Sequence, residues 1–469
     1  MEDKNNLMEK IVSLCKRRGF VWQGSEIYGG VSAIYHFGPL GVEMKNAIKR
    51  HWWATFVTKR SDVVGIEGAI LMHPDVWKAS GHIESFTDPL VECKECHSRY
   101  RKDHLEDGRL IGGKAKEKMQ CPVCGSKNFT EAKDFNLMFK TFIGPVEDQA
   151  HLAYLRPETA QSMFTDFKLV QESARMKVPF GIAQIGKSFR NEITTGDYFF
   201  RTREFEIAEI EYFVSPPSSG HVGSPANAWH WRAGEDEKYF NEWLKLWKKF
   251  YLDLGIDEKK IREYEHPKKS LAHYSKRTVD IEYNFPFGWS ELAGVANRTD
   301  FDLKSHEKFS KKDLQYFDEE TGEKYIPYVI EPTMGIERVM LAALVDGFKE
   351  SDGSDGREKG EVVMRLHPVI APVQVGVFPL VKKDKLPEIA QKITRELSEK
   401  EIRSFYDETG SIGRRYRRQD EIGTPWCVTV DFETLKDDSV TVRDRDSLKQ
   451  ERIKIDELKE YFFEKLNLS

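Results

Sequence analysis

The chain has 469 residues, of which 39% are hydrophobic and 32% charged, with a formal net charge of −5 and a pI near 6.3. At roughly 100–200 residues per domain this length predicts about three domains, and the composition is that of a globular chain with enough apolar material for real cores. No apolar run approaches the roughly 20 residues of a membrane span. The charged segment Met1–Lys10 is no signal peptide, so we expect a cytoplasmic protein with no membrane partner.

Two helices are predicted near the N-terminus. The first covers residues 6–18 and ends before Gly19, because three apolar residues share one face: Leu7, Ile11 and Leu14. The second begins at Pro39, a residue suited to the first helical turn, and its apolar residues repeat with helical spacing at Leu40, Met44, Ile48 and Trp52.

Residues 90–130 are polar and Lys-rich, and we interpret them as a small insertion. They carry two Cys-x2-Cys pairs separated by 24 residues: Cys93 and Cys96, then Cys121 and Cys124. Two such pairs supply the four soft ligands that zinc prefers, and four cysteines leave no open position, so a structural zinc site is favoured. Four unrelated buried thiols are the alternative. The small number of cysteines argues against a disulfide framework, and Cys15 and Cys427 are expected to be core thiols.

Residues 181–192 and 204–214 are predicted to be two strands joined by a loop around residues 194–198. Because strand side chains alternate between faces, Arg190 and Glu192 share one face, as do Phe205, Ile207 and Glu209. A hairpin would unite these faces into a wall with an arginine for phosphate, an aromatic plane for a base and acids for amino groups. The pattern alone also allows a solvated charged hairpin with a core phenylalanine.

The middle of the chain adds further elements. Residues 215–228 are expected to form a surface loop, 236–253 a helix and 281–295 a strand region. A helix beginning near Gly335 places Arg338 in its first turn, close to the positive end of the helix dipole, where a polyphosphate could bind. An ordinary exposed arginine is the alternative. Glu158 and Glu291 carry little meaning by themselves, because isolated glutamates usually lie on the surface.

Residues 347–362 are predicted to be a linker, since the segment 347–360 is charged, Gly-rich and nearly free of apolar residues. From 363 to 469 strands alternate with helices, which predicts a small α/β domain. This domain carries a basic cluster beside two aromatic residues, Tyr416 and Trp426, that could stack on unpaired bases. The cluster consists of Arg414, Arg415, Arg417 and Arg418. A solvated basic helix face is the alternative.

Three segments together resemble class II aminoacyl-tRNA synthetases. Phe189-Arg-x-Glu, a loop and Arg201-x-x-Glu-Phe205 resemble motif 2, Gly335-Ile-Glu-Arg338 resembles motif 3, and the segment from Pro39 through Pro74 occupies the place of the dimer-forming motif 1. Longer segments resemble the homodimeric glycyl-tRNA synthetases: Tyr28-Gly-Gly, Gly38-Pro-Leu-Gly-Val-Glu43, Val76-Trp-Lys-Ala-Ser-Gly-His82, Arg156-Pro-Glu-Thr-Ala-Gln161, Glu331-Pro-Thr and Ile412-Gly-Arg-Arg-Tyr-x-Arg-x-Asp-Glu-Ile-Gly-Thr-Pro425. The resemblance spans nearly the whole chain. Thr333-Met334 departs from it, because a Ser-Ala pair is common there.

The resemblance implies an α+β fold. Residues 1–346 would form a catalytic domain with an antiparallel sheet flanked by helices and the zinc-binding insertion, and residues 363–469 an α/β anticodon-binding domain. The implied activity is glycine activation with ATP and Mg²⁺ to glycyl-adenylate, followed by transfer to the 3′ end of tRNA(Gly), in a homodimer. Larger amino acids would be excluded by overlap, so we expect no editing domain.

The resemblance also implies site residues. Arg190, Glu192 and Arg338 would be catalytic, with Arg190 on the α-phosphate and the substrate carboxylate. Glu291 would bind magnesium, and Arg201 and Arg338 the outer phosphates. The full ATP set would be Arg190, Asn191, Glu192, Phe200, Arg201, Phe205, Glu291, Leu292, Gly335 and Arg338. The glycine set would be Arg99, Glu158, Phe205, Glu209, Glu331, Thr333 and Gly335. The basic cluster would bind tRNA, and an exposed zinc-ribbon arginine is an equal alternative for Arg99.

Two rival functions remain open from sequence. One is a synthetase-like binding subunit without catalysis, which we would expect to lack the nucleotide-binding residues that are present here. The other is a class II enzyme for serine, proline or threonine.

Overall fold

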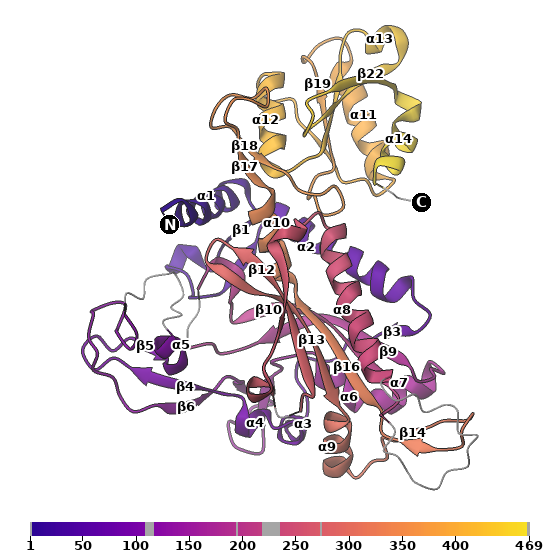
Figure 1. The fold of residues 1–469 in the computed structure, drawn as a ribbon. Coiled ribbons are helices and arrows are strands. Elements are labelled where there is room, and N and C mark those ends of the chain that lie inside the picture. The colour runs from indigo at the N-terminus through magenta and orange to yellow at the C-terminus, as the bar shows by residue number, and fades with distance from the viewer. Residues whose placement is uncertain (1, 108–116, 194–195, 218–234, 273, 467–469) are drawn as a thin grey trace.

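The computed structural model describes residues 2–107, 117–193, 196–217, 235–272 and 274–466. Most of the expected surface loop at 215–228 and the start of the loop around 194–198 lie outside the described residues. Figure 1 shows a large lower body around one sheet, with a smaller yellow body above it at the C-terminal end. Across the described ranges, no helix is long and apolar enough to span a bilayer.

A seven-stranded sheet forms the centre of the larger body, with the strand order β11-β12-β13-β16-β10-β9-β3. All neighbours pair antiparallel except β3 and β9, which are parallel. The strands are β3 (Val63–Gly65), β9 (Phe180–Phe189), β10 (Glu204–Val214), β11 (Ile261–Glu265), β12 (Arg277–Phe285), β13 (Gly288–Thr299) and β16 (Tyr328–Gly335). The expected antiparallel sheet is therefore confirmed. The strand region predicted at 281–295 is confirmed as strand, but a turn between Phe285 and Gly288 divides it into β12 and β13.

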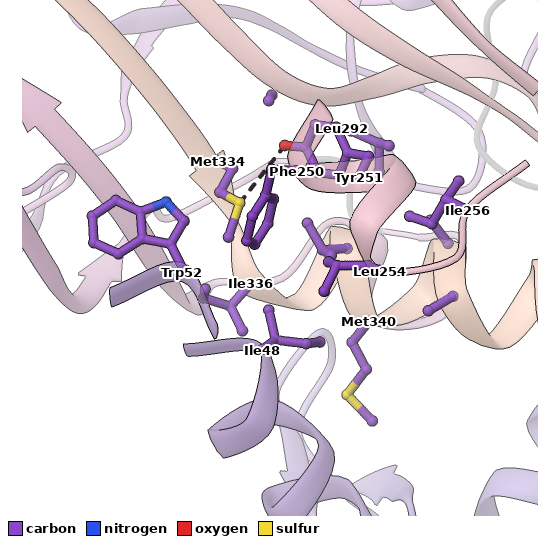
Figure 2. Packing of buried hydrophobic residues seen from close by; sticks show 14 of the residues in the cluster. Ile48, Trp52, Phe250, Tyr251, Leu254, Ile256, Leu292, Met334, Ile336 and Met340 are labelled. Atoms are coloured by element: carbon purple, nitrogen blue, oxygen red, sulfur yellow. Dashed lines mark hydrogen bonds between the residues drawn. The ribbon is translucent and has the colours of Figure 1, made fainter. Parts of the chain in front are cut away.

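Helices cover one face of the sheet and build the main core. They are α1 (Glu2–Arg18), α2 (Pro39–Trp53), α8 (Glu235–Asp253) and α10 (Ile336–Gly347). Figure 2 shows Trp52 and Ile48 of α2 meeting Ile336 and Met340 at the motif 3 helix, with the Tyr251 hydroxyl 3.6 Å from Met334 Sδ. Burying a large side chain stabilises the fold by roughly 1.5–3 kcal/mol. This packing fixes β16 and α10, the elements that carry motif 3.

The opposite face is only partly covered, by α6 (Ala160–Thr165), α7 (Phe167–Ser173) and α9 (Phe301–Ser310). They pack on one end of the sheet through a second buried cluster that includes Phe164, Phe167, Phe180, Phe213 and Leu303. In β10, Phe213 points to this cluster whereas Tyr212 and Val214 point to the main core. Period-two alternation therefore places the other odd-numbered residues of β10 on this partly open face.

The segment 90–130 lies beside the sheet, at the left of Figure 1. Its strands β4 (Thr87–Glu92) and β5 (Arg99–Arg101) form a three-stranded sheet with β6 (Lys133–Asn136), which follows the segment, in the order β5-β4-β6. The helices α3 (Pro74–Ala79) and α4 (His82–Ser85) precede this sheet in the chain, α5 (Lys102–Asp107) follows β5, and β7 (Phe139–Phe142) and β8 (Leu152–Leu155) follow β6.

The C-terminal body has a five-stranded sheet in the order β20-β19-β21-β22-β23, parallel in its first three strands and antiparallel in the rest. The strands are β19 (Val375–Pro379), β20 (Ser404–Tyr406), β21 (Trp426–Val430), β22 (Ser439–Asp444) and β23 (Gln450–Lys454). The helices are α11 (Leu386–Ser398), α12 (Ile412–Ile422), α13 (Thr434–Asp437) and α14 (Leu458–Leu466). The predicted α/β domain is confirmed, although the polar edge strand β23 was missed.

The linker predicted at 347–362 is not a flexible tether. Phe348–Glu350 (β17) pairs with Val362–Met364 (β18) as a hairpin. Between these strands, Arg357 is buried, and it donates to Asp420 of α12 and to the Arg445 carbonyl. The low apolar content of this segment was misleading, because charged side chains rather than apolar ones fix it to the second body.

Candidate active site

A cleft opens on the partly covered face, where four strands meet. In the register of the sheet, Ile207 of β10 lies opposite Gly186 of β9 and Gly335 of β16. The cleft is lined by Arg190, Glu192, Phe200, Arg201, Thr202, Phe205, Ile207, Glu291, Thr333, Met334, Gly335, Glu337 and Arg338. Residues from both halves of the catalytic body therefore converge on one space, as the predicted hairpin wall requires.

Eight of the ten residues expected to bind ATP line this cleft. Leu292 does not, because its side chain is fully buried in the core on the other face. Asn191 also lies outside the lining, and its backbone N–H donates to the Leu137 carbonyl over 2.8 Å. The strand alternation explains the first difference, since Leu292 follows Glu291 and must point the opposite way.

Arginine side chains dominate the charge of the cleft. Arg190 donates to the Pro157 carbonyl over 3.0 Å, and its guanidinium carbon lies 5.5 Å from the centre of the Phe205 ring. Arg338 lies over Phe200 and forms a 2.8 Å ion pair with Glu291. Burial in the cleft opposes ionisation of Glu291, but Arg338 and its arginine neighbours keep the pKa of this carboxyl below its ordinary value.

Two buried polar atoms face each other across the cleft without a hydrogen bond. Arg201 Nη1 and Glu192 Oε2 are 3.7 Å apart, and neither has a hydrogen-bond partner among the described residues. Leaving buried charged groups unsatisfied is costly, and such exceptions concentrate where a ligand completes them. These atoms are suited to a ligand with both anionic and donor groups, as a nucleotide has.

A buried cluster of acids lies at the inner end of the cleft. Glu209 accepts hydrogen bonds from the Thr159 backbone and hydroxyl, and Glu158 accepts one from Gln161 over 2.9 Å. Carboxylate oxygens of Glu209, Glu211 and Glu331 lie within 4.8 Å of one another. Three buried carboxyl groups this close repel each other when ionised, so the cluster is prepared for a compact cation.

Arg298 is the guanidinium inside this cluster, and the sequence analysis missed it. It forks onto Asp302 with bonds of 2.8 and 2.9 Å and donates to Glu331 over 2.8 Å. Its guanidinium carbon lies 4.1 Å from the centre of the Tyr274 ring. The available signal was the position of Arg298, one residue beyond Asn297 at the end of the apolar stretch 292–296. A register shift between Asn297 and Thr299 prevents the sequence from showing to which face of the sheet Arg298 points.

The pKa values of the acids in the cluster differ because each carboxyl group has different neighbours. Burial opposes the charge of Glu158, yet His82, Arg298 and Gln161 hold its pKa far below the ordinary value. Burial and the Glu158 charge raise the pKa of Glu209, and burial raises the pKa of Glu331 well above normal despite Arg298. Protons and charges are therefore divided unequally among the acids, which is a frequent property of functional sites.

A buried lysine connects α2 to two of the elements that line the cleft. Lys45 of α2 bonds at 2.6 Å to both Glu206 of β10 and Glu337 of α10. Burial disfavours its charge, but the two glutamates keep its pKa above the ordinary value. Each glutamate is the immediate neighbour of a cleft residue, Phe205 or Arg338, so the motif 1 helix positions both.

The four paired cysteines converge, as the spacing predicts. Cys93 Sγ lies 3.6 Å from Cys124 Sγ, and Cys96 Sγ lies 3.5 Å from Cys121 Sγ. A zinc tetrahedron with bonds of about 2.3 Å places its sulfurs about 3.8 Å apart, so the arrangement fits zinc. Arg99, in the same insertion, is bonded to Glu92 and is mostly exposed, and it does not line the cleft.

The basic cluster of α12 is divided by its contacts. Arg415 is only 3% exposed and donates to the carbonyls of Pro379, Leu380 and Gly410, so it has no surface to offer RNA. Arg417 pairs with Glu358 and Glu361, and Arg418 with Asp407. Arg414 is exposed and makes no ion pair with a described residue.

The aromatic residues expected to stack on bases are also placed differently. Trp426 is buried in the domain core, and the Tyr416 hydroxyl is bonded to Thr429 at 2.6 Å. Burial therefore excludes stacking on RNA by Trp426, whereas Tyr416 is half-buried with its hydroxyl bonded inside the domain. The exposed aromatics of this domain are Phe405 and Phe432. The sheet of this domain has one buried and one open face, and the sequence pattern of a short strand does not show which of its side chains point to the buried face.

Comparisons with known proteins agree with this layout. A family described as "tRNA synthetase class II core domain (G, H, P, S and T)" matches residues 141–346, and one described as "Anticodon binding domain" matches residues 374–465. The chain is similar to the "Glycine--tRNA ligase" of Thermobifida fusca, with 50% identity over 477 residues and 99% of each chain covered. It is also similar to the proteins of that name from Caldanaerobacter subterraneus subsp. tengcongensis, with 52% identity and 98% of each chain covered, and Acetivibrio thermocellus, with 52% identity and 97% covered.

Proposed function

The chain belongs to the glycine--tRNA ligase family of class II aminoacyl-tRNA synthetases, and from this membership we propose how its residues carry out the reaction. The enzyme activates glycine with ATP to glycyl-adenylate and transfers the glycyl group to tRNA(Gly). The observation that carries the detailed proposal is the convergence of an arginine-lined cleft and a buried acid cluster on one face of the sheet. The class II core alone also fits serine, proline and threonine enzymes. The 50% identity to a glycine enzyme, which extends over 99% of the chain, favours glycine.

ATP occupies the arginine-lined cleft. The adenine stacks on Phe205, whose ring already has Arg190 beside it. Arg190 contacts the α-phosphate and the glycine carboxylate, and Arg201 and Arg338 hold the outer phosphates. Both reactants are anionic, so these guanidinium groups lower the repulsion as the carboxylate approaches phosphorus. Glu192 accepts from the adenine amino group.

Glu291 would hold magnesium. This carboxylate is 43% exposed toward the cleft beside Arg338, and Mg²⁺ is typically bound by one or two carboxylates together with substrate phosphates. The residues present therefore fit the ion. When bound, Mg²⁺ neutralises charge on the phosphates of the leaving pyrophosphate. In the same complex Arg338 exchanges its Glu291 partner for a phosphate.

Glycine binds with its ammonium among Glu158, Glu209 and Glu331. Arg298 is bonded to Asp302 and Glu331, and His82 lies 3.4 Å from Glu158, so Glu209 is the one of these three acids that forms no ion pair with a described residue, and the ammonium would supply its cation. Thr333 and Gly335 lie next to Glu209 and Ile207 across the strand pair and limit the space. Selection is steric, because a crowded pocket can reject a larger substrate much more strongly than a smaller one.

The two peripheral sites support the same enzyme. We propose a structural zinc at Cys93, Cys96, Cys121 and Cys124, on the sulfur spacing described above. The C-terminal domain binds the anticodon region of tRNA; Arg414 is exposed for this contact, Arg417 and Arg418 would have to exchange their acidic partners for phosphates, and the buried Arg415 supports α12 without touching RNA.

A homodimer in the cytoplasm is the expected assembly. Its support is a set of exposed apolar side chains that lie on α2 or in the segment before it: Ile27, Tyr28, Val31 and Val42. Exposed apolar surface of this kind is common at interfaces between chains. Sedimentation should give twice the chain mass of 54.4 kDa. A single-chain mass at working concentration would refute the dimer.

The test of the proposed function is amino-acid-dependent exchange of pyrophosphate into ATP. Glycine should support exchange, whereas alanine, serine, proline and threonine should not. Arg190→Ala should lower glycine-dependent exchange by roughly 10²–10³, the usual effect of removing a preorganised charge donor. The matched control is Arg395→Ala on the exposed side of α11. Equal exchange with serine, or normal exchange by the Arg190 variant, would contradict the proposal.

A further inference from the structure

A second cavity borders both parts of the proposed site. Its volume is about 290 Å³, close to the roughly 300 Å³ at which small-ligand pockets begin. It shares Glu291 and Thr333 with the ATP cleft, and its lining includes Glu331 and Tyr274 of the acid cluster. It is therefore adjacent to the place where glycine and the α-phosphate are joined.

The enzyme needs space for a third reactant. After activation, a ribose hydroxyl at the 3′ end of tRNA must reach the carbonyl carbon of the adenylate. That carbon lies between the acid cluster and the ATP cleft. This cavity touches both neighbours and is therefore a suitable position for the incoming nucleoside.

The far wall of this cavity holds a histidine–aspartate pair that the activation step does not use. His266 Nε2 and Asp280 Oδ2 are 2.8 Å apart, and both side chains line the cavity. The Tyr264 ring packs edge-on against the imidazole at 5.1 Å. In the tautomer whose Nε2–H donates to the Asp280 carboxylate, Nδ1 carries a lone pair that can accept a proton, and no described residue is hydrogen-bonded to Nδ1.

Two lysines at the mouth of the cavity have no acidic partner in the described structure. Lys268 and Lys269 lie between His266 and Ser270, which both line the cavity, and both are exposed. The nearby Lys276 is by contrast paired with Asp236. Unpaired cations at the entrance suit the phosphates of an incoming RNA end, which supply most contacts in nucleic-acid binding.

We propose that this cavity takes the 3′-terminal nucleoside of tRNA and that His266, held by Asp280, accepts the proton of its attacking hydroxyl. The inference rests on the proposed function. The hydroxyl O–H bond breaks and its proton moves to Nδ1 of His266. The oxygen forms an ester bond to the glycyl carbonyl carbon, and the bond from that carbon to the phosphate oxygen breaks, so AMP leaves with the electron pair.

The experiment separates transfer from activation. The full-length enzyme is loaded with glycyl-adenylate and mixed with tRNA(Gly), and the single-turnover transfer rate is compared with glycine-dependent pyrophosphate exchange. His266→Ala and His266→Gln should each lower transfer by roughly 10²–10⁴, the usual range for general-base catalysis, while exchange stays within about twofold. Added imidazole should restore part of the transfer rate of His266→Ala.

His151 provides the matched control. It forms a similar pair with Asp148 at 2.7 Å on an exposed loop, away from the cavity lining, so His151→Ala should change neither rate. A Lys268→Ala, Lys269→Ala double variant should weaken tRNA binding and reduce its salt slope by about 1.4, the value for two contacts to single-stranded phosphates.

Three results would overturn the inference. Normal transfer by both His266 variants would remove the proton acceptor, and a parallel loss of exchange and transfer would assign His266 to activation. If the salt dependence of tRNA binding were unchanged in the double lysine variant, the 3′ end of tRNA would not enter the cavity beside Lys268 and Lys269. Failure of the proposed function itself is recognised separately, because the unaltered enzyme would then show no exchange with glycine.

Discussion

Arg298 Nη1 donates a 2.8 Å hydrogen bond to Glu331 Oε1 inside the catalytic body, and both side chains are buried. The same guanidinium forks onto Asp302, so one cation serves two acids while Glu158 and Glu209 lie nearby. The acids therefore outnumber the guanidinium, and an ammonium group can bind there as a second cation although the substrate has no side chain that can be recognised.

Replacing Arg298 should damage stability as well as glycine use. Arg298→Ala leaves buried carboxyl groups without their partner, and breaking a buried pair typically costs about 3–5 kcal/mol. We expect a loss of that size in the free energy of urea unfolding, and a raised KM for glycine in exchange. Lys249→Ala is the control, because its ion pair with Asp253 is exposed on the surface of α8 and should change stability by less than about 1 kcal/mol. Equal losses in the two variants would argue against the cluster as a buried charge network.

Glu211 should make the protein less stable as pH rises. Its carboxyl is fully buried, neither oxygen has a hydrogen-bond partner in the described structure, and burial raises its pKa well above the ordinary value. The folded state therefore holds this proton more tightly than the unfolded chain, so stability present below the unfolded pKa of about 4.3 is lost as pH rises toward the folded pKa.

Glu211→Gln tests that sign, because glutamine has nearly the same shape and no charge. The difference in unfolding free energy between the variant and the unaltered protein should grow in favour of the variant from about pH 5 upward. Urea titrations at several pH values measure it. A constant difference across that range would mean that Glu211 does not titrate differently in the two states.

Zinc should be present at one atom per chain, because the four sulfurs already have nearly tetrahedral spacing. Elemental analysis of Cys93→Ser should show most of the zinc lost, whereas Cys15→Ser should keep it, since Cys15 lies in the main core. Zinc removal should also lower the melting temperature. Full zinc content in Cys93→Ser would exclude this cysteine as a ligand.

Removing the C-terminal domain should separate the two half-reactions. The sequence places the domain boundary at residue 363, but Leu366, Ile370 and Ala371 are buried in the main core. A truncation that keeps this core intact therefore ends after Val373. A chain ending at Val373 should keep glycine-dependent exchange but lose charging by roughly 10² or more, the typical gain from a second binding module on the same chain. A fall of both activities by the same factor, with the shortened chain folded, would contradict this division of labour.

The sequence predicts best what depends on local periodicity. Strand alternation places Phe205 and Glu209 on one face, and the apolar pattern starting near Gly335 gives α10, since both follow from backbone geometry. The four cysteines are also predictable, because their spacing is part of the chemistry.

Contacts between distant segments could not be predicted in the same way. Lys45 meets Glu337 across 292 positions, and Arg298 meets Glu331 across 33, so no local pattern signals either pair. Arg415 and Arg414 are neighbours of the same type, yet one is buried and the other exposed, because only the packing of α12 on the sheet decides between them.

The most direct test is a crystal structure with a non-hydrolysable analogue of glycyl-adenylate, such as glycylsulfamoyl-adenosine. The account predicts the ammonium about 3 Å from carboxylates of Glu158, Glu209 or Glu331, with the adenine stacked on Phe205. An ammonium directed away from these acids, or an adenine bound elsewhere than on Phe205, would contradict it.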